Sequence, residues 1–437
     1  MTEVLTLLAP DGTTSRVDVR EPTVTAAAKP GHPLTERVVY AAAHVVPRAA
    51  ADNTPGAPAD LDWDATLAFR HHLWSWGLGV ADAMDTAQRN MGLDPAATRE
   101  LITRSAREAQ SVGGRIVVGV NTDDLPDGRH ELPTEQEVVD AYVRQLHHAE
   151  DAGAGVVLMA SRHLARLARG SDDAPSVFRR VYARVVEQAS APVVLHWLGE
   201  AFDPALAGYF GGAGVPAAAG ADAPAPAAAA AAGAPTAADT VLAIMRDAGE
   251  QVSGIKMSLL DAAAETALRA RLPETARMYT GDDFHYVDLI AGAPTASGRH
   301  VHSDALLGAF AAIAPIASAA VRALPDEAAF RTLLGPTEGL ARHVFSAPTW
   351  HYKTGIAFLA WLNGHQPAFA MVGGQHAGRS LPHLSETVRL ANACGALEDP
   401  SLAASRWHDL LTLAGVPVSA WRRGSAPTDR SVAGVVA

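Results

Sequence analysis

Lys256 is one of only three lysines in this chain of 437 residues; the others are Lys29 and Lys353. Since lysine and arginine total 35, arginine accounts for the remaining 32. Arginine can supply positive charge, but it cannot lose a proton and attack a carbonyl carbon as an amine can. A lysine kept in a short apolar run is therefore a candidate Schiff-base nucleophile, unless base-composition bias removed the other lysines and left this one by chance.

The apolar run around Lys256 is one of eight short, strand-like runs that are separated by amphipathic helical stretches. Eight such alternations predict a (β/α)₈ TIM barrel. A doubly wound sheet is the rival, but no Gly-x-Gly-x-x-Gly follows the first run. The predicted strands are 37–46, 78–84, 115–121, 154–161, 192–198, 252–258, 277–282 and 298–303.

Polar side chains follow nearly every predicted strand, and in a barrel these strand ends meet at one mouth. A single polar residue there is usually a cap or turn residue, so the prediction depends on their convergence. Asp82 lies near the end of predicted strand two, and His300 and Asp304 lie near the end of predicted strand eight. The predicted catalytic residues are Lys256, His196, Arg162 and His163, and the predicted substrate-binding residues are Asp85, Asn121, Ser161, Trp197, Asp282, Asp283 and His302.

Two mechanisms and one non-catalytic role fit such a mouth. In the first mechanism, Lys256 forms an imine with a keto acid or an aldehyde, Arg162 holds a carboxylate, and His163 or His196 moves protons. In the second, His300, His302, Asp304 and Asp282 bind a divalent metal in an isomerase or hydrolase. The third possibility is a barrel that has lost catalysis and binds a ligand. The adjacent pairs His71-His72 and His147-His148 are expected on helix surfaces.

The run Gly254-Ile255-Lys256 lies between Ala191-Pro192-Val193-Val194-Leu195 and Gly281-Asp282-Asp283. This order resembles the dihydrodipicolinate synthase/N-acetylneuraminate lyase superfamily over roughly residues 37–395. The segment Phe345-Ser346-Ala347-Pro348 with Lys353 is similar to that superfamily's C-terminal helical region. The resemblance implies a barrel, a class I lyase or aldolase with Lys256 as the imine-forming lysine, and a dimeric or tetrameric homo-oligomer.

Three of the superfamily's motifs are replaced in this chain. The strand-four Pro-Tyr-Tyr, which carries the catalytic tyrosine, becomes Ala160-Ser161-Arg162. The strand-two Gly-Thr-Thr-Gly-Glu, which binds the keto-acid carboxylate, becomes Ala83-Met84-Asp85-Thr86-Ala87, and the strand-five Tyr-Asn becomes His196-Trp197. The chain therefore looks like a diverged branch that acts on a different carbonyl substrate.

Three segments are expected: an N-terminal hairpin and extension over 1–35, the barrel over 36–325 with an Ala/Pro-rich insertion at 211–238, and a C-terminal helical region over 326–437. A net charge of −12 argues against nucleic-acid or anionic-membrane partners. The single cysteine, Cys394, excludes an intrachain disulfide and a cysteine-based zinc site. We expect a cytoplasmic enzyme that uses a small keto-acid substrate and needs no cofactor or metal.

Overall fold

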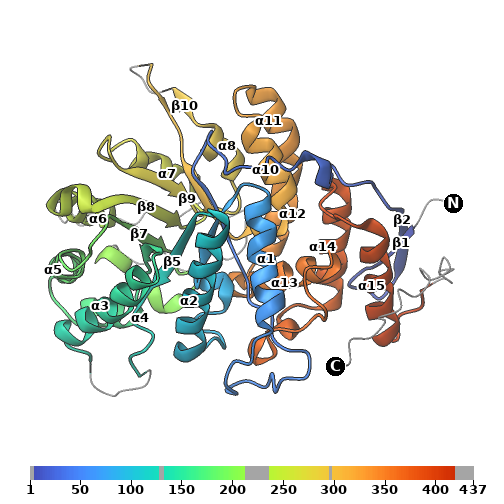
Figure 1. The fold of residues 1–437 in the computed structure, drawn as a ribbon, viewed down its shortest axis with the longest axis horizontal. Coiled ribbons are helices and arrows are strands. Elements are labelled where there is room, and N and C mark those ends of the chain that lie inside the picture. The colour runs from blue at the N-terminus through green and yellow to red at the C-terminus, as the bar shows by residue number, and fades with distance from the viewer. Residues whose placement is uncertain (1–3, 127–131, 212–235, 295–297, 419–437) are drawn as a thin grey trace, which may run out of the picture.

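The computed structural model describes residues 4–126, 132–211, 236–294 and 298–418. Eight parallel strands close into a barrel in the order β12-β3-β4-β5-β6-β7-β8-β9, with helices outside them (Figure 1), so the predicted (β/α)₈ fold is confirmed. The barrel strands are β3 (Val39–Ala42), β4 (Gly79–Asp82), β5 (Ile116–Val120), β6 (Gly155–Leu158), β7 (Val193–Leu198), β8 (Val252–Ser258), β9 (Arg277–Thr280) and β12 (Asp304–Leu307).

The barrel interior is filled by a small cluster of side chains that includes Val157, Val194, Tyr279 and Leu306. Successive side chains of a strand point to opposite faces, so every second residue of each strand enters the interior. In the β7–β8 register, Val194 lies beside Gly254 and His196 lies beside Lys256. His196 and Lys256 therefore point inward, near the carboxyl ends of their strands.

The helices between the strands have clear local start signals. Asp94 caps the helix that begins at Pro95, and Thr134 forms a capping box with Glu137. Thr236 caps a helix that begins at Ala237, within the last residues of the predicted insertion, while residues 212–235 of that insertion lie outside the described residues. These helices are α1 (Trp63–Ser75), α2 (Pro95–Val112), α3 (Glu135–Asp151), α4 (Arg162–Arg169), α5 (Ala174–Val186), α6 (Ala237–Ala248), α7 (Ala262–Arg269) and α8 (Tyr286–Ala291).

The eighth barrel strand is not where the sequence predicts it. Residues His300–Val301 form β11, which pairs antiparallel with β10 (Ala293–Pro294) outside the barrel. The sequence also predicts a helix over 304–324, but the start of that segment forms the barrel strand β12. A strand buried on both faces is a continuous apolar run, which periodicity cannot distinguish from a buried helix.

This correction moves the predicted residues of strand eight to the other end of the barrel. His300 and His302 precede the strand, and Asp304 is its first residue. The Asp304 carboxylate accepts hydrogen bonds from the Val38 backbone (2.8 Å) and from Arg277, the first residue of β9 (2.7 Å). His302 therefore lies at the amino-terminal end, opposite the mouth.

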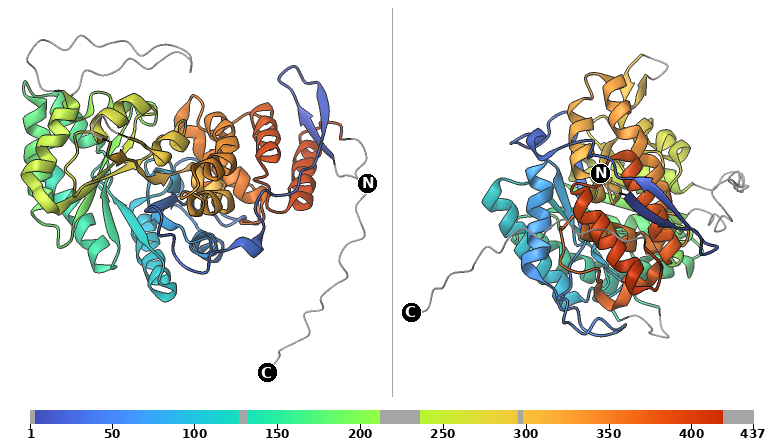
Figure 2. Two further views of the ribbon diagram at one scale, coloured as in Figure 1. Left: turned by 90° about the horizontal axis from the view of Figure 1, so that it is seen from above. Right: turned by 90° about the vertical axis from the view of Figure 1, so that its right-hand side faces the viewer.

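A layer of helices follows the barrel and carries the N-terminal hairpin on its far side (Figures 1 and 2). The predicted hairpin is formed by β1 (Val4–Leu8) and β2 (Thr14–Asp18). Leu8 donates its backbone N–H to Ser385 (2.7 Å), and Trp407 donates to the carbonyl of Thr6 (2.7 Å). The layer comprises α9 (Ala309–Ala312), α10 (Ala314–Arg322), α11 (Glu327–Leu334), α12 (Glu338–Val344), α13 (Tyr352–Leu362), α14 (Leu381–Cys394) and α15 (Pro400–Leu413).

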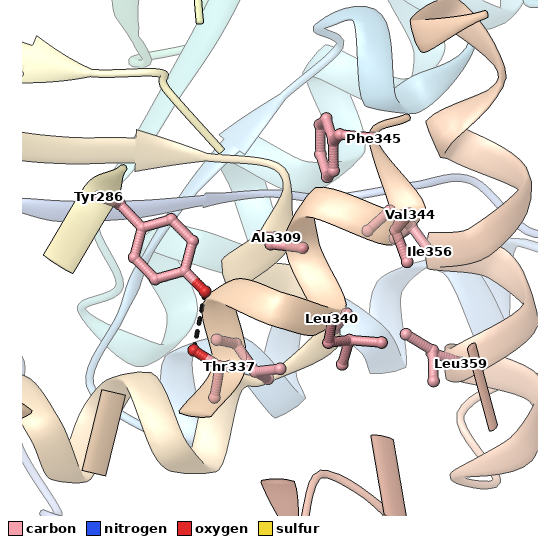
Figure 3. A pocket seen from close by; sticks show the side chains of 11 residues that line it. Tyr286, Ala309, Thr337, Leu340, Val344, Phe345, Ile356 and Leu359 are labelled. Carbon is pink, nitrogen blue, oxygen red and sulfur yellow. Dashed lines mark hydrogen bonds between the residues drawn. The ribbon is translucent and has the colours of Figure 1, made fainter. Parts of the chain in front are cut away.

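The helical layer meets the barrel through apolar side chains. Figure 3 shows a small pocket at this junction, where Tyr286 of α8 faces Leu340 of α12 and Ile356 of α13. The Tyr286 hydroxyl forms a hydrogen bond with the Thr337 hydroxyl at 2.7 Å. The junction is packed like a core, so α13 has a fixed position over the barrel.

The structure contains no helix, within its described ranges, that is long and apolar enough to cross a membrane.

Candidate active site

Lys256 lies inside the barrel near the carboxyl end of β8, and its side chain is 7% exposed. Its register neighbours are His196 on β7 and Tyr279 on β9. Gly281, just after β9, leaves room for it: a Cβ there would lie 2.8 Å from Lys256 Cε and 2.1 Å from Ser258 Oγ. A side chain at position 281 would therefore displace the lysine.

Two carboxylates bias the protonation of Lys256. Burial lowers the pKa of the amine below its ordinary value, while the charges of Asp85 and Asp283 raise it. Asp85 begins the 3-10 turn Asp85–Ala87 after β4, and Asp283 follows β9. The Lys256 amine makes no hydrogen bond to a described residue, so its nitrogen is held by burial and charge only.

Asp283 is a buried acid beside this amine. Its Oδ1 accepts a hydrogen bond from the Ala309 backbone at 2.9 Å. Burial raises the pKa of the Asp283 carboxyl above its ordinary value, against the lowering effect of that hydrogen bond and of Lys256. A carboxyl group with a raised pKa can hold a proton and donate it during a reaction.

His196 is an uncharged side chain next to Lys256. It is fully buried, and its Nε2 lies 3.3 Å from Ser258 Oγ. Burial and the charge of Lys256 lower the pKa of the imidazole well below its ordinary value. The ring is therefore uncharged at neutral pH and can exchange a proton through Ser258.

The start of α13 brings two further residues to the mouth, which sequence reasoning did not place in the site. The Tyr352 hydroxyl is 2.8 Å from Thr86 Oγ1, and Lys353 donates to the carbonyl of Trp350 at 3.2 Å. Burial lowers the pKa of Lys353 to about 8, while Asp85 and Asp203 raise it and Arg162 lowers it further. The signal that could have found Lys353 is the scarcity of lysine itself.

Arg162 begins α4 after β6 and forms an ion pair with Asp203, with Nε 2.6 Å from Oδ2. Since its charge acts on Lys353, Arg162 belongs to the cationic side of the mouth. The structure thus brings together five of the predicted site residues, namely Lys256, His196, Arg162, Asp85 and Asp283, and adds Tyr352 and Lys353.

The predicted residues Ser161, His163 and Asn121 make hydrogen bonds within the local structure. Ser161 caps α4 through the Leu164 backbone, and its Oγ lies 2.6 Å from Thr122 Oγ1. His163 Nδ1 lies 2.9 Å from the same hydroxyl. The side-chain oxygen of Asn121, Oδ1, accepts a hydrogen bond from the Thr122 backbone N–H at 2.7 Å. These bonds fix the loops after β5 and β6.

Trp197 and Asp282 lie near the mouth in sequence but face elsewhere. Trp197 packs outside the barrel against Phe210, with ring centroids 5.5 Å apart. Asp282 accepts hydrogen bonds from the backbone of Phe284 (2.8 Å) and lies 2.9 Å from His285 Nδ1. We therefore do not place either residue in contact with a substrate.

The fold is that of a class of barrels represented among solved structures. Dihydrodipicolinate synthase from Bacteroides thetaiotaomicron matches with a TM-score of 0.56 and 12% identity over 80% of this chain and 98% of its own. The 4-hydroxy-tetrahydrodipicolinate synthase from Methylacidiphilum fumariolicum SolV matches with 0.54 and 16% over 83% and 99%. A prophage protein of the dihydrodipicolinic acid synthase family from E. coli K12, solved with pyruvate, matches with 0.50 and 14% over 86% and 99%.

The predicted resemblance is confirmed at the level of the fold. The chain itself belongs to the family described as a protein of unknown function (DUF993), whose model matches residues 5–416. No curated protein sequence matches this chain.

Proposed function

We propose that this protein is a Schiff-base-forming lyase or aldolase that acts on a small 2-keto acid or a similar sugar acid. The observation that carries the proposal is the position of Lys256: an inward-facing amine near the end of β8, packed closely against Gly281 and without a hydrogen bond to a described residue. An amine whose pKa is lowered by burial is neutral over a wider pH range, as a nucleophile must be.

The neighbours of Lys256 supply the proton transfers. The amine nitrogen attacks the carbonyl carbon and forms a carbinolamine, whose hydroxyl leaves as water when the C=N bond forms. The proton that this hydroxyl needs comes from Asp283, whose raised pKa keeps the carboxyl protonated near neutral pH. The resulting iminium withdraws electrons from the adjacent carbon, so that a carbon–carbon or carbon–oxygen bond there can break.

The cationic side of the mouth gives the substrate class. Lys353 and Arg162 lie together on this side, and Asp85 and Asp203 compensate their charge. A substrate carboxylate would bind there by charge-assisted hydrogen bonds while its keto carbon faces Lys256. The solved relative from E. coli K12 is in complex with pyruvate, which supports a 2-keto acid as the first compound to test.

Reductive trapping tests this proposal. The protein is incubated with pyruvate and a panel of larger 2-keto acids, reduced with borohydride, and analysed by peptide mass spectrometry. Hydride addition to the imine gives a stable secondary amine, and the peptide gains the mass of the keto acid less one oxygen atom. Because the chain has three lysines, the peptide that gains mass identifies the reacting amine directly.

Lys29 and Lys353 are the internal controls for this experiment. We expect an adduct on Lys256 with at least one keto acid and none on the exposed Lys29. An adduct on Lys353 alone, or no adduct with any compound that the protein turns over, would show that the proposal is wrong. Compounds that bind without adduct or turnover would instead indicate the ligand-binding barrel considered above.

The metal-dependent alternative with His300, His302, Asp304 and Asp282 does not fit the structure. Asp304 is at the amino-terminal end of β12 and pairs with Arg277, whereas Asp282 follows the carboxyl end of β9. These side chains therefore do not share one site. The homo-oligomeric state stays a prediction, which sedimentation of the purified protein would measure.

A further inference from the structure

A second group of titratable side chains lies outside the barrel, where α1 meets the segments that follow α13 and α14. His72 comes from the last turn of α1, His365 follows α13, and Glu398 precedes α15. We call these three residues the His/Glu cluster. One ligand atom from each lies within 4.8 Å of the other two. His72, which was expected on a helix surface, has a side chain only 12% exposed.

The distances within the His/Glu cluster are close to those between ligands of one metal ion. His365 Nε2 lies 2.9 Å from Glu398 Oε1, and His72 Nε2 lies 3.4 Å from the same oxygen. Zinc bonds of about 2.0–2.2 Å in a tetrahedron place neighbouring ligand atoms roughly 3.3 Å apart. The carboxylate oxygen would need to move by only a few tenths of an ångström.

Hydrogen bonds within the described residues leave one member of the cluster unsatisfied. His72 Nε2 is buried and makes no hydrogen bond there. An imidazole nitrogen without a hydrogen-bond partner can offer its lone pair to a metal ion. A buried polar nitrogen without a partner costs free energy unless a ligand satisfies it.

The surrounding residues hold the cluster in shape. The side chain of Asn363 donates to the carbonyl of Ala396 (3.0 Å) and accepts the backbone N–H of Glu398 (3.0 Å), which ties the segments carrying His365 and Glu398 together. Phe69 packs against both imidazoles, with ring centroids 5.9 Å from His72 and 5.6 Å from His365. Such support is typical of residues around a metal site.

We propose that His72, His365 and Glu398 bind one divalent transition-metal ion of the zinc class, which links helix α1 of the barrel to the C-terminal helices. Two imidazoles and one carboxylate suit zinc, whereas calcium and magnesium prefer sets made of oxygen ligands. Three protein ligands leave a fourth position for water. The side chains are 12%, 18% and 25% exposed, so an ion can reach them from solvent.

Metal titration of the full-length protein tests the site. The protein is stripped with a chelator, dialysed, and titrated with Zn²⁺ by calorimetry and with Co²⁺ by visible absorption. We expect one tight site, the intense visible bands of four-coordinate cobalt, and a Zn²⁺-dependent rise in Tm. His72→Ala and Glu398→Gln should weaken Zn²⁺ binding at least a hundredfold and abolish the rise in Tm, and excess Mg²⁺ should not compete.

His71→Ala is the matched control. His71 is the neighbouring histidine on α1, and it pairs with a single carboxylate, Glu108, at 3.0 Å. The proposal requires that His71→Ala binds Zn²⁺ as tightly as the parent protein. Equal binding by the parent, His72→Ala and Glu398→Gln would overturn it, as would no saturable binding by a parent protein that is folded by circular dichroism. His72→Gln, which keeps the polar volume, repeats the test if His72→Ala does not fold.

Discussion

Two buried lysines share one carboxylate in this protein, yet they are held very differently. Lys256 comes from strand β8 and makes no hydrogen bond to a described residue, whereas Lys353 comes from helix α13, donates to the Trp350 carbonyl and lies 4.6 Å from the centre of the Tyr352 ring. The charge of Asp85 raises the pKa of both amines. The ammonium group of Lys353, which a hydrogen bond holds in place, suits the binding of an anion. The amine of Lys256, which has no such bond, suits nucleophilic attack.

The difference teaches that burial alone does not identify the reacting lysine. Both pKa values are lowered by desolvation, so the pKa shifts alone would make either residue a candidate. Lys256 packs closely against Gly281, and the charge of Asp283 raises its pKa, whereas the carboxylates that raise the pKa of Lys353 are Asp85 and Asp203. Geometry therefore assigns the two lysines to different tasks, and each prediction below tests that assignment.

The largest effect is expected from replacing the nucleophile. Lys256→Arg keeps the positive charge but cannot form an imine, so we expect turnover of the keto acid to fall about a thousandfold or more. The measurement is the steady-state kcat/KM. Lys353→Arg is the matched change at the other lysine and should keep most of kcat. If Lys256→Arg keeps parental activity, the imine mechanism is wrong.

Gly281→Ala should come next. The new Cβ would lie 2.8 Å from Lys256 Cε and 2.1 Å from Ser258 Oγ, so the amine must move. A displacement of about 1 Å at a reacting atom costs on the order of a hundredfold, which we expect in the rate of borohydride trapping. Gly335→Ala is the control, because nothing lies within 4 Å of a Cβ there. Equal trapping rates in both variants would contradict the close approach at Gly281.

Lys353→Met should separate binding from chemistry. Loss of a charge-assisted contact to the substrate carboxylate predicts a KM about tenfold higher or more with little change in kcat. A fall in kcat with an unchanged KM would place Lys353 in the chemical step instead.

The same variant should be more stable than the parent at pH 7. The folded pKa of Lys353 is about 8 against an ordinary 10.5, so the unfolded chain binds more protons between these values. The cost to the folded state is present in full below pH 8 and disappears as the pH rises to 10.5, and it amounts to about 3 kcal/mol. The free energy of unfolding, measured with denaturant, should be higher for Lys353→Met than for the parent protein at pH 7 but not at pH 10.5.

The smallest effect is a shift of the pH profile. Asp85 raises the pKa of Lys256, so Asp85→Asn should lower that pKa further. Trapping needs the neutral amine, and its rate rises with pH through the pKa of Lys256. The rise should therefore occur at a lower pH in Asp85→Asn. A shift to higher pH would show that Asp85 does not act on this amine.

Most of the fold could be predicted from the sequence because buried parallel strands are short apolar runs with turn residues between them. Seven predicted strands overlap observed strands of the barrel. The eighth failed because His300-Val301-His302 alternates as a strand should, while the apolar segment from Asp304 to Ala312 contains both the true strand and a short helix. Local pattern does not show which of two neighbouring extended segments completes a barrel.

The candidate site was predictable on the strands and in the segments that directly follow them. Lys256 and His196 share an inward register, and the same alternation would have directed Trp197 outward, where it packs on Phe210. Tyr352 and Lys353 reach the mouth because α13 packs over the barrel, where its Ile356 lines the same pocket as Tyr286 and Leu340 (Figure 3). Sequence spacing does not encode this packing.

The position of the trapped adduct tests the central claim most directly. After incubation with a keto acid that the protein turns over and reduction with borohydride, peptide mass spectrometry separates the three lysines. The account predicts that the added mass lies on Lys256 and is lost in Lys256→Arg but kept in Lys353→Arg. Added mass on Lys353 in the parent protein, with Lys256 unmodified, would contradict it.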